Sequence, residues 1–226
     1  IRQIMGTWSL ARLYTFTGEQ KYLEAWERNM KFNFDNYYVY DEERDFGYLL
    51  FNGKAKLGSA AFALSSILEI DDPEYADEKR ELINFIYYLQ QADGAFDTFF
   101  IPEDRNDNQY YYPGEALLSL MILYEHTGDR EILEKFEKSF LFYRRYYRED
   151  RNPAFIPWHT QALYKAFLVT KKPEYAEFVF EMNDWLVEEM LWDSLEPYPD
   201  FIGRYYSAEN PQYGPPHAAS SSVYIE

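Results

Sequence analysis

The sequence contains no cysteine and is poor in basic residues. Without cysteine the chain forms neither disulfides nor thiolate metal sites. The absence of cysteine does not indicate whether the protein works in an oxidising or a reducing compartment. It carries 22 Lys and Arg against 39 Asp and Glu, a formal net charge of −17. A surplus of this sign repels phosphate groups and argues against a nucleic-acid partner. No run approaches the ~18 apolar residues that a membrane-spanning helix needs, so we expect no such segment.

Several catalytic and binding motifs are also missing. The sequence has no glycine-rich phosphate loop, no His-Glu-x-x-His zinc motif and no nucleophile elbow. It therefore predicts neither a cofactor nor a metal site.

Aromatic residues, by contrast, are abundant. The chain has 23 Tyr, 18 Phe and 5 Trp, which together make 20% of its residues. Many of the tyrosines fall between the predicted helices rather than on helix faces. Because Tyr and Trp combine a flat apolar face with a polar edge, they suit sugar rings and interfaces alike.

A repeated unit of helix, short turn and helix organises the chain. Its four turns are Thr17–Gln20, Asp71–Glu74, Thr127–Arg130 and Lys171–Glu174. Gly18 and Asp72 are 54 residues apart, Asp72 and Gly128 are 56 apart, and Gly128 and Lys172 are 44 apart. A period near 50 of paired helices predicts either an open solenoid or a closed ring of hairpins.

The two helices of each unit differ in hydrophobic pattern. The helix before each turn is apolar almost all round and should be buried, whereas the helix after it has one apolar stripe and one charged face. The predicted inner helices are 3–16, 55–70, 114–126 and 158–170, and the outer ones are 20–40, 74–91, 130–147 and 174–191. A ninth helix is expected to begin near His217.

The loops at the other end of the hairpins are long, and they cover 41–54, 92–113, 148–157 and 192–216. All of them lead into the N-termini of inner helices. This asymmetry favours an all-α fold, an α/α toroid of alternating inner and outer helices, over an open solenoid. We expect residues 1–226 to form a single, incomplete toroid domain that belongs to a longer chain. An apolar flank near Ala218 should then face a missing segment or another chain.

Three segments resemble the six-hairpin glycosidase-like superfamily: Tyr110–Ala116, Thr127–Asp129 and Tyr213–Ser220. The resemblance covers the whole chain as architecture and identifies no single member family. It implies a carbohydrate-active toroid, a class that includes glycoside hydrolases, sugar epimerases and polysaccharide lyases. A complete ring of this superfamily has six hairpins, of which this chain supplies about four and a half. The toroidal zinc cyclases are disfavoured, since their cysteine ligands are absent.

Glu115 is the first candidate for catalysis, because it lies in the first turn of an inner helix directly after a tyrosine-rich loop. It is either a general acid or base, or an acidic residue that only complements the helix dipole. Glycoside hydrolysis generally needs a second carboxylate, and Asp97 is the preferred one. Asp104 and Asp107 are alternatives, although their segment is also typical of a solvated turn.

His159 and His217 both stand at the predicted N-terminal ends of inner helices. A helix N-terminus favours the neutral imidazole, which can accept a proton, so each is a candidate catalytic residue or a structural one. Tyr112 is a further candidate for proton abstraction.

The predicted substrate-binding residues belong to the same long loops and helix starts: Tyr111, Trp158, Arg204, Tyr205 and Tyr206. The aromatic rings are expected to stack on a sugar ring or to pack between loops. Arg204 would pair with a uronate carboxylate, or with a neighbouring surface acid.

These residues lead to three functional hypotheses. The first is a glycoside hydrolase acting on an oligosaccharide, in which Glu115 donates a proton and Asp97 activates water. The second is a lyase or epimerase, in which a Tyr or His removes the proton next to a uronate carboxylate. The third is a non-catalytic helical-repeat module that binds glycan or protein through its aromatic face.

Overall fold

The computed structural model describes residues 2–190. These residues belong to two compact units, one that extends to Tyr143 and one that starts at Arg144. The helix α6 (Arg130–Glu149) contains the boundary between them.

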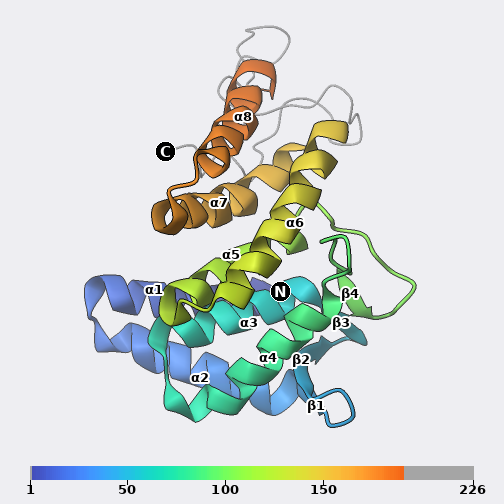
Figure 1. The fold of residues 1–226 in the computed structure, drawn as a ribbon. Helices are drawn as coiled ribbons and strands as arrows, with labels where there is room; N and C mark the ends of the chain where they lie inside the picture. Colours follow the sequence, from blue (N-terminus) through green and yellow to red (C-terminus); the bar gives the residue numbers. More distant parts are fainter. Residues whose placement is uncertain (1, 191–226) are drawn as a thin grey trace, which may run out of the picture. The chain divides into compact units, whose positions relative to one another are not determined.

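Five helices and the first part of α6 make up the first unit. They are α1 (Arg2–Thr17), α2 (Gln20–Tyr37), α3 (Leu57–Ile70), α4 (Ala76–Leu89, preceded by the 3-10 turn η1, Pro73–Tyr75) and α5 (Tyr112–Thr127). Helix α3 packs against both α1 and α5, while α2 pairs with α1 and α4 pairs with α3 (Figure 1). The inner helices α1, α3 and α5 therefore form one layer, and α2 and α4 cover it, as the hydrophobic patterns predict.

Small residues let the inner helices approach one another. Twelve residues of α3 are buried, and Ala60, Ala61 and Ala63 are among those with no exposed surface. Helix α2 contributes the large side chain of Trp26, whose indole N–H donates to the Ser66 hydroxyl at 2.8 Å. Because a buried indole N–H is costly without an acceptor, this hydrogen bond fixes how α2 lies on α3.

The four short turns share one backbone solution. The residue that follows each inner helix has a positive φ and returns its N–H to the carbonyl four residues earlier, which ends the helix. These residues are Gly18, Asp71, Gly128 and Lys171, with φ of 69°, 54°, 66° and 57°.

The long loops of the first unit contain a small antiparallel sheet that the sequence analysis did not predict. Its strands β1 (Tyr38–Asp41), β2 (Phe46–Phe51), β3 (Lys54–Lys56) and β4 (Phe99–Ile101) pair in sequence order. Asn52 and Gly53, both with positive φ, form the tight hairpin between β2 and β3. The sheet lies at the end of the unit where α3 begins (Figure 1), and the Leu57 N–H donates to the Thr98 carbonyl at 3.1 Å.

The second unit contains the end of α6, the 3-10 turn η2 (Pro153–Phe155), α7 (Ile156–Thr170) and α8 (Pro173–Met190). Helices α7 and α8 form a hairpin. Tyr147 of α6 is fully buried and contacts the rings of Phe155 and Phe178.

Every helix predicted between residues 3 and 191 is present, with bounds that agree within a few residues. The strands are the main departure, and they leave the chain mostly helical. None of the helices between residues 2 and 190 combines the length and the apolar character that a membrane crossing needs.

Candidate active site

Glu115 occupies the first turn of α5, as predicted. The loop before α5 ends in a turn, in which the N–H groups of Tyr111 and Tyr112 donate to the Asn108 carbonyl at 3.0 and 3.2 Å. Pro113 then stands in the first helical turn, where a missing N–H costs nothing. The Glu115 N–H donates to the Tyr111 carbonyl at 3.1 Å, which sets the carboxyl group at the start of the helix.

The Glu115 side chain turns toward the N-terminal end of α3 and lies on Gly58. A methyl group at position 58 would come within 2.0 Å of Glu115 Oε2 and within 2.9 Å of the Tyr112 ring. Because Gly58 has no side chain, the Glu115 carboxyl group and the Tyr112 ring can lie directly against the first turn of α3. Tyr112 and Glu115 therefore form one cluster with the first turn of α3.

Burial controls the protonation state of Glu115. The residue is 6% exposed, and Oε2 has no hydrogen-bond partner among the described residues. Loss of solvent raises its pKa to about 8, and nearby positive charge, including that of Lys56, opposes the rise only in part. At neutral pH the carboxyl group is therefore mostly protonated and able to donate a proton.

Two cations approach an aromatic ring beside this cluster. Lys56 ends β3 and pairs in register with Phe99 of β4. Lys56 Nζ lies 5.6 Å and Arg105 Cζ lies 4.3 Å from the centre of the Phe99 ring. The Phe99 ring in turn lies 5.9 Å from the ring of Tyr112. None of Lys56, Gly58, Phe99 and Arg105 was predicted as a site residue, although Lys56 and Gly58 lie in the first turn of the predicted inner helix 55–70.

Asp97 makes its contacts elsewhere in the same loop. Its carboxylate accepts hydrogen bonds from the side chains of Gln91 and, at 3.5 Å, Asn106. Burial raises the pKa of Asp97, and the hydrogen bond from Gln91 opposes that rise. The described interactions thus join Tyr112 to Glu115 and join Asp97 to Gln91, and the pairing of Asp97 with Glu115 stays a prediction.

The alternative carboxylates in this loop have different surroundings. Asp107 accepts two hydrogen bonds from the Arg105 guanidinium, one of them at 2.7 Å, and this partner lowers the pKa of Asp107. Asp104 is exposed. Asp107 is therefore held as an ion-pair partner of Arg105.

Two predicted site residues belong to the second unit. Trp158 is half-buried and His159 is buried, both near the start of α7. The His159 ring stacks on Phe155 at 3.5 Å, and its Nδ1 is 2.8 Å from the Phe155 carbonyl. Burial lowers the pKa of His159 to about 3, so the ring is neutral at physiological pH.

The remaining predicted residues fall into two groups. Tyr111 is 37% exposed and lies directly before α5. Arg204, Tyr205, Tyr206 and His217 lie outside the described residues, as does the flank near Ala218.

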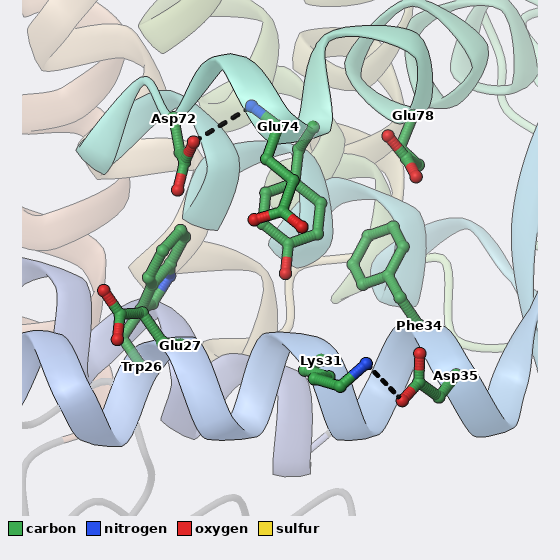
Figure 2. A pocket seen from close by; sticks show the side chains of 9 residues that line it. Trp26, Glu27, Lys31, Phe34, Asp35, Asp72, Glu74 and Glu78 are labelled. Carbon is green, nitrogen blue, oxygen red and sulfur yellow. Dashed lines mark hydrogen bonds and ion pairs between the residues drawn. The ribbon is translucent and has the colours of Figure 1, made fainter.

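A cleft of about 330 Å³ lies between α2 and the turn that joins α3 to α4. The walls of the cleft carry mainly acidic side chains, and Phe34 of α2 lies on the side of α2 that faces Glu78 of α4 (Figure 2). Asp72, Glu74 and Glu78 line it from one side, and Lys31 forms an ion pair with Asp35 on the other. The cleft adjoins the C-terminal end of α3, about 20 Å along that 14-residue helix from Gly58. It is therefore separate from the Glu115 cluster.

The described part of the chain contains no group of three or more His, Asp or Glu side chains placed to hold a metal ion.

Comparisons with known proteins are informative at the level of structure. No protein-family model matches the sequence, and no curated protein matches it. Among solved structures, an inactive variant of an α-1,6-mannanase of Salegentibacter sp. HEL1_6, in complex with α-1,6-mannotetrose, is 15% identical with a TM-score of 0.64. The match covers 82% of this chain and 63% of the mannanase.

Two further structures are similar. The Lin0763 protein of Listeria innocua is 16% identical with a TM-score of 0.62, and the match covers 83% of this chain and 60% of that protein. Cellobiose 2-epimerase of Spirochaeta thermophila DSM 6192 is 11% identical with a TM-score of 0.52, over 99% of this chain and 82% of the enzyme. This chain thus spans less than two thirds of the first two structures. The likeness to these structures shows that the chain has an α/α-toroid fold, as predicted.

Proposed function

We propose that this chain carries the catalytic acid of a glycoside hydrolase that acts on an oligosaccharide. The observation that supports it best is Glu115, a buried carboxyl group at the start of an inner helix with a pKa raised to about 8. A general acid must hold its proton at working pH, and burial supplies that condition here.

In this reaction the Glu115 proton passes to the glycosidic oxygen as the bond between that oxygen and the anomeric carbon breaks. A water molecule adds to the anomeric carbon, and its proton goes to a second carboxylate. Asp97 remains our candidate for that base. The mannanase structure, which holds an oligosaccharide, supports a saccharide as the ligand of this fold.

Sugar epimerisation is the second candidate function. The match to cellobiose 2-epimerase covers 99% of this chain and favours this alternative. Epimerisation removes a proton from one carbon of the sugar and returns a proton to its opposite face, and it releases no new reducing end. Product analysis therefore separates it from hydrolysis.

The test uses the full-length protein with α-1,6-mannooligosaccharides, cellobiose and uronate-containing oligosaccharides. New reducing ends report hydrolysis, an epimerised sugar in an oligosaccharide of unchanged length reports epimerisation, and an unsaturated product reports lyase action. Glu115→Gln keeps the size of the side chain but removes its titrating proton. If Glu115 is the acid, turnover should fall at least ~100-fold, and wild-type turnover should decline above about pH 8.

Glu134→Gln is the matched control, because Glu134 is an exposed carboxylate of α6. It should leave turnover within twofold of wild type. If Glu115→Gln keeps full activity while the fold is intact, the proposed role of Glu115 is wrong. If none of these saccharides is turned over, the hydrolase proposal fails, and binding without turnover would favour the non-catalytic module.

A further inference from the structure

Lys56 is a half-buried cation in a strongly acidic chain. Within residues 2–190 the ammonium group of Lys56 forms no ion pair with a carboxylate, and it lies over the ring of Phe99. Burial lowers the pKa of Lys56, and the charges of Lys54 and Arg105 lower it further. The Lys56 ammonium group is thus partly removed from water, and a negatively charged ligand would stabilise it.

Two carboxyl groups, those of Glu115 and Asp107, interact electrostatically with Lys56, but neither neutralises its charge. Glu115 is close enough to interact with Lys56, but it is mostly protonated at neutral pH and carries little charge. Asp107 also attracts Lys56, but its two oxygens accept from the Arg105 guanidinium. The positive charge of Lys56 therefore remains available to a ligand.

The position of Lys56 relates this charge to the proposed catalytic group. Lys56 precedes Gly58 by two residues, and Glu115 Oε2 lies on Gly58. Phe99 is the strand partner of Lys56 and also lies beside Tyr112. An anionic group bound by Lys56 would thus belong to a sugar unit that carries the glycosidic oxygen protonated by Glu115, or to the adjacent sugar unit.

We propose that Lys56 binds an anionic substituent of the saccharide, a carboxylate or a sulfate ester, beside Glu115. This inference rests on the proposed function, and it assigns to Lys56 the recognition that the sequence analysis gave to Arg204. Arg105 lies on the same ring but is paired with Asp107, so Lys56 supplies the direct contact. A lysine ammonium suits both anions because it acts as a point charge without a fixed geometry.

The experiment measures binding to the Glu115→Gln protein, which keeps ligand intact, by calorimetry. The probes are hexuronate trisaccharides of the gluco, manno and galacto series, their carboxyl-reduced neutral counterparts, and 6-O-sulfated forms of those counterparts. With lysine at position 56, the protein should bind at least one anionic probe ~10-fold or more tightly than the neutral counterpart of that probe. The member that binds best distinguishes carboxylate from sulfate recognition.

Lys56→Gln should abolish this preference and leave binding of the neutral sugar unchanged. Lys56→Arg should restore most of it, and Lys54→Gln, on the exposed neighbour in the same strand, should have no effect. Equal loss for anionic and neutral sugars would mean that Lys56 only supports the fold, and an unchanged preference would overturn the proposal. Binding that depends on Lys56 without turnover by the wild-type protein would contradict the hydrolase proposal alone.

Discussion

At the scale of single residues, Glu115 links protonation to folding. Its pKa is about 8 in the folded chain, against an ordinary value of 4.5. Between these two values the folded chain holds a proton that the unfolded chain has lost. The free energy of unfolding should therefore fall as pH rises through this window, by up to about 1.4 kcal/mol per pH unit.

Glu115→Gln should remove this dependence, because the amide does not titrate. Denaturant unfolding of both proteins at intervals from pH 5 to 9 tests it. The stability of the wild type relative to the variant should be greatest at pH 5 and should decrease steadily toward pH 8. Two parallel curves would show that Glu115 ionises as an ordinary carboxyl group does.

The comparison with the variant is needed because His159 acts in the opposite direction. Its pKa is lowered from 6.5 to about 3, so the unfolded chain binds a proton that the folded chain excludes. The contribution of His159 is complete above pH 6.5 and is lost as pH falls toward 3. The two windows overlap, and only the difference between wild type and variant isolates Glu115.

The position of Glu115 could be predicted from sequence, but its environment could not. A tyrosine-rich loop followed by an apolar helix indicates a first-turn carboxylate. Its burial depends on Gly58, which lies 57 positions earlier and belongs to another helix. Lys56 and Phe99 come together through strand pairing that no local pattern of the chain specifies.

At the scale of elements, the helices were predictable because their hydrophobic periods are long and their turns are marked. The sheet was missed because its strands are short and sit within segments rich in polar residues. One signal was present, since Asn52-Gly53 directly after the apolar stretch Phe46–Phe51 is typical of a tight hairpin. The strands set the start of α3, so this signal bears directly on the candidate site.

The helix-ending turns offer a test at this scale. Lys171 ends α7 with φ of 57°, whereas Gly128 ends α5 with φ of 66° in the equivalent position. A side chain in the left-handed region is strained, and glycine is not. Lys171→Gly should therefore raise the free energy of unfolding by ~0.5–1 kcal/mol, measured by denaturant titration.

The matched control reverses the exchange. Gly128→Lys should destabilise the chain by a similar amount, since nothing lies within 4 Å of an added Cβ at that position and only backbone strain is introduced. If both substitutions destabilise, the contact of Lys171 Nζ with the Phe167 ring outweighs the relief of strain.

At the scale of the whole chain, the excess of acidic residues determines the sign of the net charge. The surplus of 17 negative charges opposes folding through repulsion, which the ion pairs at the surface offset only locally. The cleft in Figure 2 concentrates this effect, because Glu27, Asp72, Glu74 and Glu78 share its walls with Lys31 as their basic neighbour. Burial and the neighbouring acids raise the pKa of Glu78.

Salt should therefore stabilise the protein. Raising NaCl from about 10 to 200 mM shortens the screening length from ~30 Å to less than ~10 Å, which weakens distant repulsion more than close ion pairs. We expect Tm to rise by a few degrees, because about 1 kcal/mol corresponds to ~2–4 °C for a chain of this size. KCl should act as NaCl does if screening is the cause.

Two substitutions in the cleft separate net repulsion from loss of particular contacts. Glu78→Gln removes one negative charge, so it should raise Tm at low salt and reduce the gain on adding salt. Lys31→Gln removes the positive charge on the opposite wall of the cleft. It should lower Tm at low salt and increase the gain in Tm on adding salt, because it breaks the pair with Asp35 and adds to the net negative charge. Thermal unfolding of the three proteins at both salt concentrations gives the comparison. A Tm that falls with salt, or two variants that shift in the same direction, would show that local ion pairs and not the acidic surplus control the electrostatic stability of this chain.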